Sequence, residues 1–210
     1  MQNKAMVFVG CDPGQTGAIS FIHTDGRVNI IPMPVTKSKV NGKNKTKLNI
    51  LALSSILEDI DPANSFLVME IQQAMRRPLF ATLEGTNERI MVDEGDVQGT
   101  SASFNNGYGY GILKGLITAY KIPHECVAAQ KWQSKIFPNI RSQGTKPTSI
   151  ETAKRLYPNV SLRLNPDNAR ETTDKHGLSD SLLIAHYAKL IYNRTGGLNV
   201  ATMLLGGEDE

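Results

Sequence analysis

The sequence predicts an α/β domain built on a five-stranded mixed sheet, in which an antiparallel three-strand meander adjoins two parallel strands and helices flank the sheet. Three strand-like segments joined by short connections open the chain, and helical and strand-like segments then alternate. A chain of 210 residues, 40% of them apolar, is also long enough to bury one sizeable core.

The predicted meander consists of residues 6–12, 17–23 and 27–32, which are dominated by apolar strand formers. The connections are the short segments DPGQ and TDGR, and the second contains an Asp-Gly hairpin signal. Strands joined so closely pair antiparallel, because a parallel pair needs a long crossover. The meander therefore forms one side of the predicted sheet.

A helix and a buried strand follow. Residues 48–60 carry apolar side chains at helical spacing, and Asp61-Pro62 ends this helix. The segment FLVME, residues 66–70, is a buried strand that ends in a carboxylate. Residues 71–100 have mixed charge and no clear period, so they are predicted to form a long irregular loop of the kind that is usually functional or mobile.

The second half of the chain alternates helices with a further strand. The predicted elements are a helix at 103–121, a strand at 122–128 and helices at 131–137, 148–156 and 178–192. Thr148 and Glu151 have the spacing of a capping box. We expect residues 1–194 to form a single domain and residues 195–210 a flexible tail. The element order β-β-β-α-β-α-β-α is typical of an RNase H-like fold.

Positive charge is concentrated in one segment. The net charge is only +3, but residues 36–47 hold five lysines and no acid, namely Lys37, Lys39, Lys43, Lys45 and Lys47. Such a segment is either a solvated surface loop or an arm that binds a polyanion such as DNA. The segment alone leaves both interpretations open.

Cysteine usage and hydropathy indicate the cellular compartment. Cys11 and Cys126 lie in apolar segments and are expected in the core rather than in a zinc site. The N-terminus does not resemble a signal peptide, and no apolar stretch is long enough to span a bilayer. We therefore expect no membrane partner and a cytoplasmic protein, located in the bacterial host cytoplasm if phage-encoded.

Three carboxylates stand at the ends of predicted core elements. Asp12 ends the first strand, Glu70 ends the fourth, and Asp180 lies near the start of the last helix. Each alone has an ordinary interpretation, as a turn residue, a solvent-facing strand end or a first-turn helix acid. If the two strands are neighbours, however, the three carboxylates meet and require a cation, for which Mg²⁺ or Mn²⁺ is suited. Two such ions about 3.5–4 Å apart support phosphodiester hydrolysis.

These motifs resemble those of RuvC-like Holliday junction resolvases, especially phage-encoded ones. The similar segments, in order, are GCDPGQTGA, LVMEIQ, SFNNGYGYGILKGLITAYKIPHECVAAQKWQ, KPTSIETAKRLYP and DSLLIAHYA. The resemblance implies an RNase H-like fold and a homodimer that nicks four-way DNA junctions symmetrically with two Mg²⁺ or Mn²⁺ ions per active site. It also implies that Asp12, Glu70 and Asp180 are the family's catalytic acids.

The fourth metal ligand departs from the family pattern, which has Asp or His three or four residues before the last aspartate. Three residues before Asp180 stands Gly177, which has no side chain, and four before stands His176 on the same helical face. We favour His176 as the ligand. Asp174 is the alternative if the helix begins later.

Further residues are expected to contact DNA or the active site. The family's wedge phenylalanine corresponds to Gln73, so that role is open or has passed to a residue such as Phe80. The expected basic contacts are Arg76 and Arg77 for DNA, and Lys131 and Lys146 near the family's basic active-site positions. The glycine-rich helix at 103–121 is the candidate dimer interface.

Two other functions are compatible with parts of the sequence. The DPGQTG segment also resembles the phosphate-binding hairpin of actin and sugar kinases, but that architecture needs two such domains and the chain is too short. A junction-binding protein without catalysis is the second alternative, and the three acids oppose it. A metal-dependent nicking assay on a synthetic junction separates the three possibilities.

Overall fold

The computed structural model describes residues 5–40, 42–72, 79–82, 89–93, 100–137, 145–168 and 173–194. Five strands form the central sheet: β1 (Val7–Cys11), β2 (Ala18–His23), β3 (Val28–Pro32), β6 (Ser65–Glu70) and β9 (His124–Val127). Their order is β3-β2-β1-β6-β9. Strands β1, β2 and β3 pair antiparallel, whereas β6 runs parallel to β1 and to β9. The predicted five-stranded mixed sheet, with an antiparallel three-strand meander beside two parallel strands, is confirmed.

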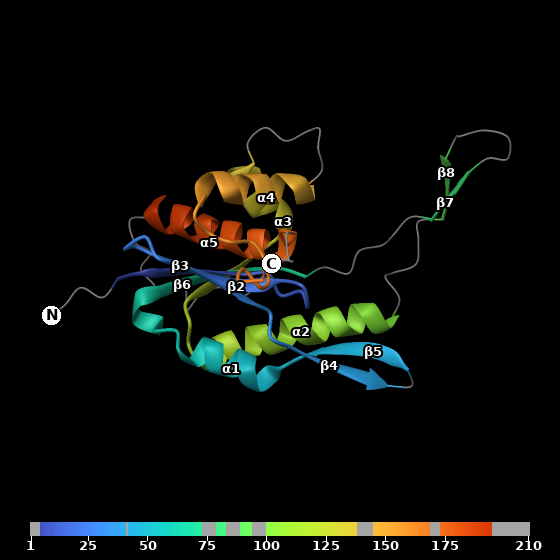
Figure 1. Cartoon of the computed structure of the whole chain (residues 1–210), viewed down its shortest axis with the longest axis horizontal. Helices are drawn as coiled ribbons and strands as arrows, with labels where there is room; N and C mark the ends of the chain where they lie inside the picture. The colour runs from blue at the N-terminus through green and yellow to red at the C-terminus, as the bar shows by residue number, and fades with distance from the viewer. Residues whose placement is uncertain are drawn as a thin grey trace.

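Helices cover both faces of this sheet (Figure 1). On one face lie α1 (Ile50–Glu58) and α2 (Thr100–Ala119). On the other lie α3 (Ala129–Ile136), α4 (Thr145–Leu156) and α5 (His176–Arg194), and the short 3₁₀ helix η1 (Pro62–Asn64) precedes β6. Alternate strand residues point to opposite faces, so the sheet separates two hydrophobic cores. Phe8 belongs to the α5 side and Val9 to the α1–α2 side.

Helix α5 lies directly against the backbone of β1. A Cβ atom on Gly10 would stand 2.2 Å from both the nitrogen of Ala185 and the carbonyl oxygen of Ser181, so only glycine permits this approach. A hydrogen bond of 2.7 Å between the buried hydroxyls of Ser20 and Ser181 joins α5 to β2 as well. The position of α5 along the sheet is thereby tightly defined.

The lysine-rich segment is a hairpin and not the predicted loop. Strands β4 (Val35–Val40) and β5 (Lys43–Leu48) pair antiparallel over six residue pairs. Lysines alternate here with Thr, Ser and Asn, a period-2 pattern without an apolar face, and Asn41-Gly42 is a strong hairpin signal. Gly42 has the left-handed φ of 74° that such a turn requires.

Other expectations also need correction. Segment 71–100 contains a second hairpin, β7 (Leu79–Thr82) with β8 (Arg89–Asp93), which lies away from the sheet in Figure 1. The fourth helix begins at Thr145, so Thr148 is buried inside it and the predicted capping box is wrong. The last helix begins at His176, two residues earlier than expected.

The expected C-terminal tail at 195–210 lies outside the described residues. Within the described part of the chain, no helix is both long and apolar enough to cross a membrane.

Candidate active site

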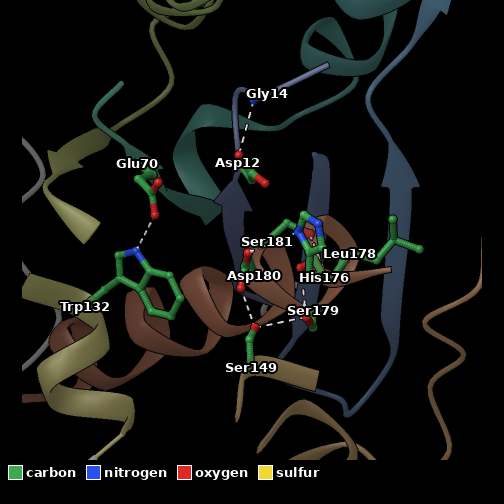
Figure 2. A network of polar contacts seen from close by, with 10 residues as sticks. All are labelled: Asp12, Gly14, Glu70, Trp132, Ser149, His176, Leu178, Ser179, Asp180 and Ser181. Atoms are coloured by element: carbon green, nitrogen blue, oxygen red, sulfur yellow. Dashed lines mark hydrogen bonds and ion pairs between the residues drawn. The ribbon is translucent and has the colours of Figure 1, made fainter. Parts of the chain in front are cut away.

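Asp12 follows β1 directly, at the start of the tight turn 12–17, here called the Asp12 turn (Figure 2). The amide of Gly14 donates a 3.2 Å hydrogen bond to Oδ1 of Asp12. A Cβ atom on Gly17 would stand 2.7 Å from Cγ of Asp12, so a glycine lets the turn close over the carboxylate. Burial raises the pKa of the Asp12 carboxyl, while the Gly14 amide and nearby His176 oppose the rise.

Glu70 is the last residue of β6, beside the end of β1. The parallel register pairs Cys11 with Met69, so Asp12 and Glu70 come next on two neighbouring strands and lie at the same sheet edge. The indole Nε1 of Trp132 donates a 2.7 Å hydrogen bond to Oε2 of Glu70. Burial raises the pKa of Glu70, the Trp132 bond lowers it, and the Asp12 charge raises it further.

Asp180 projects from the first turns of α5 toward α4. The hydroxyl of Ser149 donates a hydrogen bond to Oδ1 of Asp180 and lies 2.9 Å from the hydroxyl of Ser179. The Ser179 hydroxyl in turn donates to the backbone carbonyl of His176 over 2.8 Å. The hydrogen bond from Ser149 to Asp180 thus joins the beginning of α5 to α4.

His176 is the first residue of α5, one helical turn before Asp180. Its Nδ1 lies 4.0 Å from Oδ2 of Asp180. A Cβ atom on Gly177 would stand 2.1 Å from the carbonyl oxygen of Thr16, so a glycine lets the start of α5 pack against the Asp12 turn. Asp174, the alternative ligand, instead pairs with Lys154 at 2.5 Å.

The structure brings these four side chains to one end of the sheet but does not make them converge. In Figure 2, Glu70 is directed toward Trp132 and Asp180 toward Ser149. Among the described residues, no three His, Cys, Asp or Glu side chains lie close enough to hold one metal ion. The donor types still fit a hard divalent cation, because three of the four are carboxylates and the fourth is an imidazole.

The basic residues that the sequence placed near the site are distributed differently. Lys131 lies beside Trp132 in α3, but its ammonium group pairs with Glu125 at 2.6 Å. Lys146 lies in α4 and Phe80 in β7, and their side chains are outside the described residues. Gln73, Arg76 and Arg77 also lie outside the described residues.

Sequence reasoning missed two residues that position the acids. Trp132 is fully buried and carries the indole that holds Glu70. It is the only tryptophan of the chain, and that rarity could have marked it in the sequence as a candidate site residue. Ser149, also buried, holds Asp180, and nothing in its local sequence distinguishes it from an ordinary helical serine.

The lysine hairpin β4–β5 lies next to the site. The amide of Gln15, in the Asp12 turn, donates a 3.4 Å hydrogen bond to the carbonyl of Thr46 in β5. The side chains of Lys37, Lys39, Lys45 and Lys47 are exposed. The antiparallel register places Lys37 and Lys39 on one face of the hairpin and Lys45 and Lys47 on the other.

Comparison with known proteins finds similarity of fold to solved structures. No family model and no curated protein matches the chain. The chain is similar to the Thermus thermophilus RuvC structure, with 13% identity and a TM-score of 0.44 over 91% of this chain and 98% of that one. It is also similar to T. thermophilus RuvC in complex with Holliday junction substrate, with 11% identity, a TM-score of 0.48 and coverage of 91% and 97%. Likeness at this level says nothing about a site, so the chemistry rests on the residues of this chain.

The raised pKa of Asp12 predicts a pH-dependent stability. The folded protein binds the proton of the Asp12 carboxyl more tightly than the unfolded chain does. The contribution of protonated Asp12 to the free energy of unfolding is therefore fully present at low pH and is lost as pH rises through the folded pKa. Asp12→Asn carries no charge and avoids that loss. We expect the variant to resist urea better than the wild type at neutral pH in EDTA, with the difference disappearing in acid.

Divalent cations in the same experiment are expected to reverse this order. A metal site at Asp12 would let Mn²⁺ or Mg²⁺ stabilise the folded wild type by mass action and leave Asp12→Asn unaffected. Urea denaturation with and without Mn²⁺ measures the effect. A wild type that is no more stable in Mn²⁺ would contradict a metal site at Asp12.

Proposed function

We propose that this chain is a metal-dependent endonuclease of the RuvC-like, phage type that resolves four-way DNA junctions by paired symmetric nicks. The observation that carries the proposal is the placement of Asp12 and Glu70 at the ends of two neighbouring parallel strands, with α5 bringing Asp180 to the same edge. Carboxylates placed this way are costly to a fold unless they bind something.

Asp12, Glu70, Asp180 and His176 are the residues that would hold the metal. When bound, two Mg²⁺ or Mn²⁺ ions lower the pKa of the attacking water and stabilise the leaving oxygen of the phosphodiester. Glu70 and Asp180 accept hydrogen bonds from Trp132 and Ser149 respectively, and each would offer its carboxylate to the metal. Asp12 keeps its Gly14 amide, which holds the carboxylate in place at the end of β1.

The lysine hairpin is the proposed DNA-binding arm. Its exposed ammonium groups neutralise phosphates without reading sequence. The hydrogen bond between Gln15 and Thr46 fixes the base of the hairpin beside the Asp12 turn, so a DNA backbone bound along β5 passes close to the acids. Arg76, Arg77 and Phe80 remain proposed DNA contacts, and Lys131 and Lys146 remain proposed active-site cations.

One feature of the site favours the alternative of a branched-DNA-binding protein without catalysis. Glu70 and Asp180 are both occupied by protein donors, and the acids do not converge in this structure. The two functions differ in whether the acids are needed for cleavage, which substitution of the acids tests.

Substitution of the acids separates cleavage from binding. Asp12→Asn, Glu70→Gln and Asp180→Asn are each expected to abolish nicking of a synthetic four-way junction in Mg²⁺ and to leave junction binding intact. The acids hold the metal, whereas lysines and arginines hold the DNA backbone. Nicking by the purified wild type that is equally fast in EDTA, or that survives any one substitution, would refute the assignment.

The identity of the fourth ligand is tested by exchange of its side chain. His176 lies near Asp180, whereas Asp174 is paired with Lys154, so His176→Ala is expected to lower the cleavage rate and the Mn²⁺ affinity. His176→Asp is expected to retain much of both, since an oxygen ligand suits Mg²⁺. Asp174→Asn serves as the control and should have little effect. The reverse pattern would assign the role to Asp174.

The role of the lysine hairpin is tested by removing its charge. Replacing Lys37, Lys39, Lys43, Lys45 and Lys47 by alanine is expected to weaken junction binding and to reduce the slope of log affinity against log salt, by up to about 0.9 for each phosphate that is no longer neutralised. Binding measured over a range of salt concentrations gives the slope. If the slope does not change, the lysines are a solvated surface and do not touch DNA.

A homodimer is expected, because it matches the two symmetry-related strands of a junction. Helix α2 presents an exposed stripe of Gly107, Gly111 and Gly115, where an added Cβ would meet no atom within 4 Å. Such a stripe allows two helices to approach closely. We expect a solution mass of twice the 23.0 kDa of one chain, and a bulky residue at Gly111 should lower it. A wild type that is monomeric with junction bound would contradict this.

A further inference from the structure

Two large aromatic side chains at the start of α2 are exposed to solvent in the single chain. Phe104 is 70% exposed and Tyr108 is 52% exposed. They stand one helical turn apart, and their rings stack with centroids 6.2 Å apart and planes only 16° from parallel. Because both rings are exposed, the fold does not gain the hydrophobic free energy that their burial would provide. This aromatic pair therefore presents a flat apolar surface to solvent.

The aromatic pair lines a pocket that includes residues of the Asp12 turn. The pocket has a volume of about 220 Å³. Its walls come from residues 13–15 of the Asp12 turn, residues 46–48 of β5 and the first turns of α2. Gly14 is shared by the pocket wall and the Asp12 carboxylate, to which its amide donates. The pocket is therefore built partly on the turn that holds the carboxylate of the proposed catalytic acid.

The lining of the pocket has the chemistry of a nucleotide site. Besides the two rings, it contains the exposed ammonium group of Lys47 and the amides of Gln15 and Asn105, and none of its lining residues is acidic. Aromatic faces stack on nucleobases, a lysine neutralises a phosphate, and amides match the donors and acceptors of base edges. The remaining lysines of the hairpin extend the same positive charge away from the pocket.

We propose that the aromatic pair stacks on an unpaired nucleobase of branched DNA, with Lys47 on the adjoining phosphate. A four-way junction whose branch point is opened offers such a base, and the pocket holds it beside Asp12. The proposal rests on the proposed function only for the class of ligand, which is DNA. A second copy of the chain is the competing occupant, because Phe104 and Tyr108 stand at the end of the glycine stripe.

The test uses a four-way junction that carries the fluorescent base 2-aminopurine at the branch point, and a single-stranded oligonucleotide that carries the same base. Stacking on an aromatic ring quenches this fluorophore. The wild type is compared with the double variant Phe104→Leu/Tyr108→Leu, which keeps apolar, helix-forming side chains but removes the rings. The exchange Phe104→Tyr/Tyr108→Phe keeps both rings, and Leu51→Ala removes an unrelated side chain that is 82% exposed on α1.

We expect the wild type, the ring-exchange variant and Leu51→Ala to quench the probe and to bind both DNAs alike. The double leucine variant is expected to lose the quenching and to bind about tenfold more weakly, with an unchanged salt slope because no charge is removed. Unchanged quenching and affinity in that variant would overturn the proposal. So would a monomeric mass for that variant beside a dimeric wild type, because the rings would then belong to the dimer interface.

The two proposals fail in different ways. A wild type that quenches the probe but does not nick the junction in Mg²⁺ would refute the nuclease and leave the base-stacking site standing. A double leucine variant that nicks, binds and quenches like the wild type would refute the stacking site and leave the nuclease standing.

Discussion

The close packing of α5 on the first hairpin of the sheet is the constraint on which the site depends. Gly10, Gly17 and Gly177 each stand where a single added Cβ would collide with backbone or with Asp12. Because these positions lack side chains, α5 lies directly on β1 and its first turn reaches the Asp12 turn. Asp180 and His176 stand in that first part of α5, so the same close packing carries them to the edge where β1 and β6 end.

The site created by this packing is electrostatically unfavourable by itself. Burial raises the pKa of both Asp12 and Glu70, and each charge raises the free energy of the other. The fold offsets part of this cost with hydrogen bonds to Asp12 from the Gly14 amide, to Glu70 from the Trp132 indole and to Asp180 from the Ser149 hydroxyl. A divalent cation would offset it more completely, which is the physical link between the geometry and the proposed chemistry.

The acids stand on well-buried elements, whereas the groups around the site are exposed. The acids stand on the central sheet and on α5, whose core residues are fully buried. The lysine hairpin and the aromatic pair stand on the opposite side of the Asp12 turn, exposed, and they meet at the pocket beside Gly14. A half-buried site with charged and aromatic groups at its rim suits a substrate that is long, anionic and partly unstacked.

The sequence by itself determined the order of the strands and helices of the sheet domain, because apolar periodicity reports which local structure buries a side chain. It also placed Asp12 and Glu70 at strand ends, since a carboxylate after an apolar strand is a local feature. It did not show the hairpins β4–β5 and β7–β8. The strands of the first alternate lysines with polar residues and have no apolar face, and those of the second are only four and five residues long. The partners of the acids were decided only by tertiary structure: Trp132 lies 62 residues from Glu70 and Ser149 lies 31 from Asp180. Such hydrogen bonds depend on how whole helices pack on the sheet, and no local pattern records that packing.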